Sequence, residues 1–173
     1  MKRIIIDQEK CDGCKNCSIA CMQAHREAVD SSKGSIYDLD LMDPKNEARH
    51  RIVITSKGYV PVFCRHCAMP DCVGACMSGA LKKDSDTGHV QYDEKRCGAC
   101  FMCVMSCPYG NIKPDRVTRS KIIKCDFCKG QNGPGQNGPG QNGPNDDGDP
   151  NCVKLCPKKA IHVEEVDAGG IAV

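Results

Sequence analysis

The sequence from Cys97 to Pro108 reads Cys-Gly-Ala-Cys-Phe-Met-Cys-Val-Met-Ser-Cys-Pro. Its cysteines are separated by two, two and three residues, and they are Cys97, Cys100, Cys103 and Cys107. The first three thiolates are spaced to wrap one side of a cube of iron and sulfide, whereas the fourth serves a neighbouring cluster. We expect Cys107 on the turn that follows, at the start of a helix. Pro108 suits the exit from that turn because its φ is fixed and it lacks an N–H. The stretch therefore predicts ligands for iron–sulfur clusters.

The rest of the chain repeats this stretch. Its 173 residues include 16 cysteines in four groups of four, with none left over, and every group ends in a C-x3-C step. The groups are Cys11, Cys14, Cys17 and Cys21; Cys64, Cys67, Cys72 and Cys76; Cys97, Cys100, Cys103 and Cys107; and Cys125, Cys128, Cys152 and Cys156. Because a [4Fe–4S] cluster takes four cysteines, the count predicts four clusters with these cysteines as the iron ligands.

So many cysteines in a short chain indicate either disulfides or metal. Residues 1–7 are basic, but they contain only three apolar isoleucines before an acid, which is too few for a secretory signal. No apolar run approaches transmembrane length. We therefore expect a cytoplasmic chain with reduced thiols and no direct membrane insertion, which favours metal over a disulfide scaffold.

Zinc is the main alternative metal. The C-x2-C pairs alone would fit zinc, and the split fourth group resembles a zinc knuckle. However, the third cysteine two residues further on and the C-x3-C-P ending have no use in a zinc site of four thiolates. Iron is therefore favoured, either throughout or with one zinc among several clusters.

The formal net charge of +2 gives no sign of a nucleic-acid surface. Sixteen thiolates on four clusters would contribute roughly −2 per cluster and bring the molecule to about −6. The lysines and arginines near the cysteines then partly compensate this charge. The basic stretch 113–124 is expected to be a solvated face or a surface for docking a partner.

Local patterns predict short elements between the cysteine groups. We expect strands over residues 3–7, 51–55, 59–63 and 160–164, a hairpin of 80–83 with 89–92, and a helix over 19–29. Three copies of Gly-Gln-Asn-Gly-Pro occupy residues 130–144, and they are expected to form a flexible or polyproline-like surface loop.

The four groups, their order, the wide gap between Cys67 and Cys72 and the split fourth group resemble one family. It comprises the four-cluster ferredoxin-like electron-transfer subunits that accompany molybdopterin oxidoreductases, formate-linked hydrogenases and carbon monoxide dehydrogenases. The resemblance implies crosswise pairing of the groups, first with fourth and second with third. The implied ligand sets are Cys11, Cys14, Cys17 and Cys156; Cys21, Cys125, Cys128 and Cys152; Cys64, Cys67, Cys72 and Cys107; and Cys76, Cys97, Cys100 and Cys103. The Gly-Gln-Asn-Gly-Pro repeat departs from the family pattern.

The resemblance also implies a metal-stabilised α+β fold of two ferredoxin-like modules with a pseudo-two-fold relation. Each module would hold two clusters and contain short hairpins and a helix after a C-x3-C step. Module 1 is expected over residues 1–30 and 118–173, including a flexible repeat loop at 130–148. Module 2 is expected over the inserted residues 52–117, with a surface insertion at 31–51.

No motif for substrate chemistry is present: outside the Gly-Gln-Asn-Gly-Pro repeat the sequence has no G-x-G-x-x-G dinucleotide fingerprint, and it has no Walker A loop and no H-E-x-x-H. We therefore expect no catalytic residue and an electron-transfer role beside a catalytic oxidoreductase. The resemblance favours carbon monoxide dehydrogenase of anaerobes, then a formate dehydrogenase or hydrogenase, then a molybdopterin enzyme. The expected acceptor is a flavoprotein or hydrogenase. A free polyferredoxin shuttle and a redox sensor are the alternatives.

Two histidines lie near the cysteine groups, His25 just after the first and His66 inside the second. Either histidine has the chemistry to donate a hydrogen bond toward a cluster and tune its potential. The simpler interpretation is that both are ordinary helix or loop residues.

Overall fold

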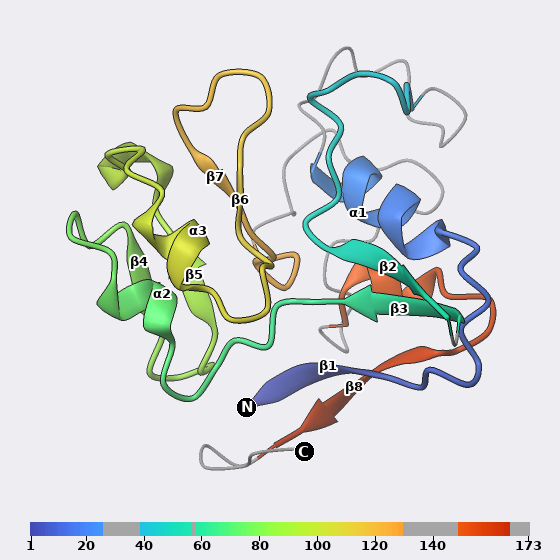
Figure 1. Ribbon diagram of the computed structural model, residues 1–173. Helices are drawn as coiled ribbons and strands as arrows, with labels where there is room; N and C mark the ends of the chain where they lie inside the picture. The colour runs from blue at the N-terminus through green and yellow to red at the C-terminus, as the bar shows by residue number, and fades with distance from the viewer. Residues whose placement is uncertain (26–38, 57, 130–148, 167–173) are drawn as a thin grey trace.

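The computed structural model describes residues 1–25, 39–56, 58–129 and 149–166, and regular structure is short throughout them (Figure 1). The strands are β1 (Lys2–Ile6), β2 (Arg51–Thr55), β3 (Gly58–Val62), β4 (Leu81–Lys83), β5 (Val90–Tyr92), β6 (Lys113–Pro114), β7 (Ile122–Ile123) and β8 (Ile161–Glu165). The helices are α1 (Asn16–His25), α2 (Asp71–Gly74), α3 (Met102–Ser106) and α4 (Asn151–Lys154), with a 3-10 turn η2 (Glu94–Arg96). This is a small α+β architecture, as expected.

Within the described residues, the strands form antiparallel pairs of β1 with β8, β2 with β3, β4 with β5 and β6 with β7. The strands predicted from the sequence are confirmed, whereas the two-residue pair β6–β7 was not predicted. The β1–β8 pair places Ile4 opposite Val163 and so joins the two ends of the chain (Figure 1). Pro61 lies in β3, which has a partner on one side only, and this is where a sheet tolerates proline.

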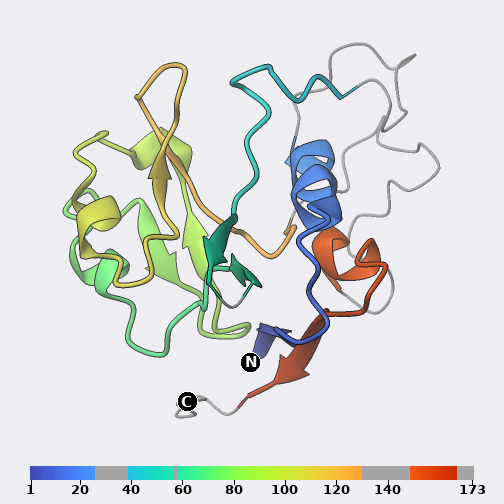
Figure 2. The same ribbon diagram turned by 45° about the vertical axis from the view of Figure 1, so that its right-hand side comes forward.

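The apolar core consists of two clusters. One lies by α2, α3 and the β4–β5 hairpin, and its buried members are Leu81, Val90, Cys103, Ile112 and Ile122. The other lies where α1 packs against α4 (Figure 2), and its buried members are Cys17, Phe63, Cys152 and Ile161. Cysteines are therefore part of both cores, so whatever they bind contributes directly to the free energy of folding.

α1 begins earlier than the sequence predicts. The spacing predicts a helix over 19–29 that begins near the fourth cysteine of its group, but α1 begins at Asn16 and contains both Cys17 and Cys21. Residues 26–29 lie outside the described part of the chain. The C-x3-C step is thus itself helical, since it spans about one turn of 3.6 residues.

In the other groups the short helix likewise overlaps the C-x3-C step and does not follow it. α3 contains Cys103, whereas Cys107 is extended, with φ −77° and ψ 110°. The expectation that Cys107 starts a helix is therefore wrong. Pro108 gives the reason, because a proline disfavours the helical region for the residue before it. Pro70 and Pro150 stand directly before α2 and α4, at helix starts where a missing N–H costs little.

Two predicted segments are only partly described. Residues 39–50, from the expected surface insertion 31–51, contain neither helix nor strand. Leu39, Ala48 and His50 are nevertheless buried, so this stretch also contributes to the interior. The repeat loop predicted over 130–148 lies outside the described residues.

Candidate iron–sulfur sites

One cavity, called cavity A, has a volume of ≈ 360 Å³ and a lining that includes four cysteines. They are Cys64, Cys67, Cys72 and Cys107. The first two lie on the loop after β3, the third lies on α2 and the fourth follows α3. The structure therefore brings together, from two separate groups, one of the ligand sets that the resemblance implies.

A second cavity, called cavity B, has a volume of ≈ 290 Å³. The cysteines in its lining are Cys21, Cys125, Cys128 and Cys152. They come from α1, from the loop after β7 and from α4. Phe63 and Pro150 add apolar surface to this lining, which keeps water away from the sulfur atoms. Cavity B thus gathers a second implied set from the two ends of the chain.

Members of the two remaining implied sets lie near one another. Burial, together with the nearby thiols of Cys76, Cys100 and Cys97, raises the pKa of Cys103 to about 11. Burial likewise raises the pKa of Cys17 to about 11, with smaller contributions from Cys14 and Cys11. Cys156, the fourth member of that set, packs against the apolar cluster that contains Cys17.

The C-x2-C loops share a backbone conformation that the sequence did not reveal. In each of the four groups, the residue before the second cysteine has a positive φ: Gly13 (73°), His66 (44°), Ala99 (52°) and Phe127 (61°). A left-handed residue reverses the loop and turns successive N–H groups toward one centre, a geometry that favours anions. For non-glycine residues it costs roughly 1–2 kcal/mol each. A bound anionic cluster would supply the compensation for this strain.

Three of the fourth cysteines accept a backbone hydrogen bond at sulfur. The N–H of Arg49 lies 3.2 Å from Cys21 Sγ, that of Leu81 3.4 Å from Cys76 Sγ, and that of Asn111 3.5 Å from Cys107 Sγ. Hydrogen bonds to sulfur stabilise thiolates and raise the reduction potential of a cluster.

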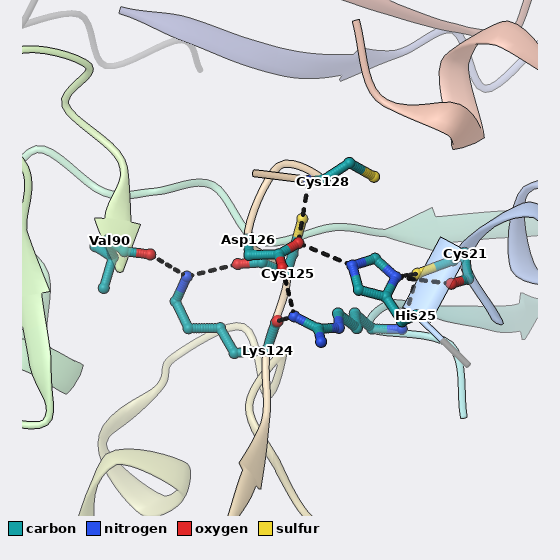
Figure 3. Close-up of polar contacts among 8 residues, drawn as sticks. Cys21, His25, Val90, Lys124, Cys125, Asp126 and Cys128 are labelled. Carbon is teal, nitrogen blue, oxygen red and sulfur yellow. Dashed lines mark hydrogen bonds and ion pairs between the residues drawn. The ribbon is translucent and has the colours of Figure 1, made fainter. Parts of the chain in front are cut away.

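A polar network holds the loop of Cys125 against α1 (Figure 3). The His25 ring lies with Nδ1 2.7 Å from the Cys21 carbonyl oxygen and Nε2 3.0 Å from Asp126 Oδ1. Asp126 also accepts hydrogen bonds from the Cys128 N–H at 3.0 Å and from Arg49 Nη1 at 2.7 Å. The network therefore positions cysteines of cavity B that are about a hundred residues apart in sequence.

This hydrogen-bond geometry sets the protonation of His25, Asp126 and Cys21. Both ring nitrogens of His25 face acceptors, so the ring carries two protons; burial opposes this, but the bonds to Asp126 and Cys21 raise its pKa to about 9. Burial alone would raise the pKa of Asp126, but His25 and Arg49 lower it. Similarly, burial raises the pKa of Cys21, but His25 and His50 bring it down to about 6. Among the cysteines of cavity B, Cys21 is thus prepared to bind as a thiolate.

The other singled-out histidine, His66, is 1 % exposed and lines cavity A. Its Nδ1 accepts the Val90 N–H at 2.9 Å, so the ring proton is on Nε2, which has no partner among the described residues. The ring packs near His89, with centroids 4.7 Å apart. His66 therefore connects the lining of cavity A with β5.

The donor set fits iron–sulfur clusters. All sixteen cysteines lie in the described residues and are free thiols. Burial raises the pKa of Cys72 to about 11 and that of Cys128 to about 12. Without a bound metal, these thiols therefore stay protonated at neutral pH. A coordinating metal deprotonates such thiols outright. Four sulfur donors around a partly open cavity match the ligation of [4Fe–4S] clusters.

Comparison with known proteins defines the class. A family described as a 4Fe-4S dicluster domain matches residues 55–139. An iron-sulfur protein of Rhodospirillum rubrum is 31 % identical, covering 98 % of this chain and 85 % of its own. The B subunit of anaerobic dimethyl sulfoxide reductase of Escherichia coli (strain K12) is 32 % identical, covering 94 % of this chain and 72 % of its own. NADH-dependent phenylglyoxylate dehydrogenase subunit beta of Aromatoleum evansii is 32 % identical over 91 % of this chain, which spans only 29 % of that relative.

The fold and the thiol sites therefore define an iron–sulfur protein of the [4Fe–4S] type. The chain belongs to the family of iron–sulfur proteins that includes the Rhodospirillum rubrum protein and the B subunit of the dimethyl sulfoxide reductase. None of the helices in the described residues is long and apolar enough to cross a membrane.

Proposed function

We propose that the protein is a non-catalytic electron relay that holds four [4Fe–4S] clusters. The observation that carries the proposal is the convergence of four cysteines, drawn from two groups, on each of cavities A and B. The proposed ligands are the four implied sets of sixteen cysteines, and each cluster would accept and release one electron at a time.

Thiols of adjacent sets that raise one another's pKa support a linear order of the four sites. Burial raises the pKa of Cys152, and Cys17 from the adjacent set adds to the thiols of its own set. Burial also raises the pKa of Cys125, with Cys64 of cavity A as the next cause. The remaining junction is covalent, because the C-x3-C step joins Cys103 to Cys107. The proposed order therefore runs from the Cys11 set through cavity B and cavity A to the Cys76 set.

The two proposed modules each follow one pattern. In one, α1 packs against α4 beside the β1–β8 pair. In the other, α2 packs against α3 beside the β4–β5 pair. These pairs support the proposed pseudo-two-fold relation between residues 1–30 with 118–173 and residues 52–117.

The proposed partner is a catalytic oxidoreductase subunit. Relatives named as the B subunit of a dimethyl sulfoxide reductase and as subunit beta of a phenylglyoxylate dehydrogenase support that class. Within it, the family resemblance favours carbon monoxide dehydrogenase, then a formate dehydrogenase or hydrogenase, with a flavoprotein or hydrogenase as acceptor. We place the protein in the cytoplasm, since its sixteen free thiols need a reducing compartment.

The test is the metal content of protein purified without oxygen. Four [4Fe–4S] clusters predict about sixteen irons per chain and a broad visible absorption that bleaches with dithionite. A content near eight irons, or bound zinc, overturns the proposal. Co-purification of a large catalytic subunit would identify a fixed subunit, and its absence would favour the free shuttle.

A further inference from the structure

Lys124 is a buried cation at the boundary between cavities A and B. Its side chain is part of a residue only 3 % exposed. Its Nζ donates hydrogen bonds to the carbonyl oxygens of Val90 and Cys125, both at 2.7 Å (Figure 3). Val90 lines cavity A, and Cys125 lines cavity B. The ammonium group is therefore tied by direct contacts to the walls of both cavities.

No carboxylate of the described residues pairs with this ammonium. By contrast, Lys121 pairs with Glu94 at 3.1 Å and Lys113 pairs with Glu47 at 2.5 Å. Two carbonyl dipoles are a weak replacement for a counter-ion, and a buried charge is costly unless it is paired. The anions close to it would be the thiolate sets of cavities A and B.

The effect of Lys124 reaches a thiol in each set. Burial raises the pKa of Cys72 in cavity A, and Lys124 is the largest influence that lowers it. Burial and Cys64 raise the pKa of Cys125 in cavity B, and Lys124 again opposes them. His66 does not share this role, because burial and Lys124 itself hold its pKa well below the usual value.

We propose that Lys124 is a cation shared by the clusters of cavities A and B, and that it raises the reduction potentials of both. The inference rests on the proposed function. Reduction adds one negative charge to a site, and a nearby positive charge in a poorly polarisable interior stabilises that added charge. One residue thereby tunes both ends of the electron-transfer step between the two halves of the chain.

The experiment measures the potential of each cluster by redox titration followed by electron paramagnetic resonance. The neutral variants are Lys124→Met and Lys124→Gln, and Lys124→Arg retains the charge. We expect at least a tenfold fall in the reduction equilibrium constant of both inner clusters in the neutral variants, which is about 59 mV for one electron. In Lys124→Arg, the reduction equilibrium constants of both inner clusters should stay within threefold of the wild-type values.

Two matched controls separate charge from general damage. Lys121→Gln removes a partly exposed lysine that has its own carboxylate, so it should leave every potential unchanged. Lys83 donates hydrogen bonds to the carbonyl oxygens of Cys67 and Ala68. Lys83→Gln should therefore shift the reduction potential of the cavity A cluster and leave the other potentials unchanged. The inference is overturned if a neutral variant of Lys124 shifts the reduction potential of only one inner cluster. It is also overturned if the potentials of the outer clusters shift as much as those of the inner ones.

Folding failure also gives a decision. Loss of only the two inner clusters from both neutral variants supports shared charge compensation, since a misfolded chain would lose all four. Loss of all four clusters from both, with full retention in Lys124→Arg, overturns the inference in favour of a structural clamp. Unchanged reduction potentials in a neutral variant that carries all four clusters also overturn the inference about Lys124. A wild-type protein with fewer than four clusters overturns the proposed function itself.

Discussion

The carboxylate of Asp126 lies 3.0 Å from Nε2 of His25, although the two residues are 101 positions apart in the chain. This contact joins the helix that carries Cys21 to the loop that carries Cys125 and Cys128. Both cysteine segments line cavity B. The geometry of that site therefore depends on the contacts that Asp126 makes with His25 and Arg49.

Replacing Asp126 with alanine should destabilise the protein. The substitution removes the acceptor for His25, for Arg49 and for the Cys128 N–H. Leaving such groups unpaired costs about 1–3 kcal/mol. We expect a lower unfolding temperature and early loss of one cluster on heating, measured by circular dichroism and by iron release.

The matched control for this substitution is Glu94→Ala. Glu94 forms an exposed ion pair with Lys121, and such pairs contribute about 0–1 kcal/mol. The control should behave like wild type. Equal unfolding temperatures and equal iron retention in Asp126→Ala and wild type would contradict a positioning role for Asp126.

The stabilisation by the ion pair of His25 with Asp126 should also depend on pH in a defined direction. The pKa of His25 is raised from 6.5 to about 9, so its contribution is complete below pH 6.5 and is lost as the pH rises through about 9. The pKa of Asp126 is lowered, so its own contribution is lost only as the pH falls below its ordinary range. The stability difference between wild type and Asp126→Ala should therefore shrink from pH 6.5 to 10. Denaturant unfolding measures it, and a difference that grows with pH would contradict this assignment.

Gly13 should not tolerate a side chain. Its φ is +73°, and a Cβ atom there would lie 2.3 Å from Cγ of Tyr59. Overpacking of this kind costs about 1–3 kcal/mol, in addition to the strain of the left-handed backbone. Gly13→Ala should therefore lower the free energy of unfolding and weaken the site of Cys11 and Cys14.

Gly74 provides the control for that substitution. It lies in α2, and no atom would meet a Cβ within 4 Å. Alanine is favoured over glycine in a helix by about 0.5–1 kcal/mol, so Gly74→Ala should be neutral or stabilising. If Gly13→Ala were as stable as Gly74→Ala in denaturant unfolding, the close approach of Tyr59 would not matter.

Local apolar runs and turn residues predict the positions of most strands, and the cysteine spacing predicts the candidate ligands, because both are local signals in the sequence. Prolines carry further local information: Pro70 and Pro150 mark where α2 and α4 begin, and Pro108 explains why Cys107 is extended. The predicted helix begins too late because a C-x3-C step suggests a turn before a helix, whereas the step is the helical turn itself.

Other features have no local signal. Gly13 suggests a left-handed residue, but His66, Ala99 and Phe127 adopt the same conformation with side chains that ordinarily avoid it. The pairing of His25 with Asp126 depends on how distant segments pack, which no spacing encodes. Likewise, a lysine before Cys125 looks like a solvated charge in the sequence, whereas burial makes Lys124 a part of the interior.

The crosswise pairing of cysteine groups gives the sharpest test of the proposed sites. Cys103 and Cys107 are neighbours in one motif, yet Cys107 lines cavity A with Cys72, and Cys103 lies near Cys76. Cys107→Ala and Cys103→Ala should therefore each damage a different cluster of about four irons. Residues of one site give non-additive losses, whereas residues of independent sites give additive ones.

Double variants turn that expectation into a measurement of iron content and of paramagnetic resonance spectra after reduction. Adding Cys107→Ala to Cys72→Ala should cause little further loss, because both residues serve cavity A. Adding Cys107→Ala to Cys103→Ala should remove a second cluster. The opposite result, with additive loss for the first pair and none for the second, would mean that the stretch from Cys97 to Cys107 binds a single cluster by itself. In that case the motif would be one site, and the proposed passage of electrons between clusters that share a motif would lose its structural basis.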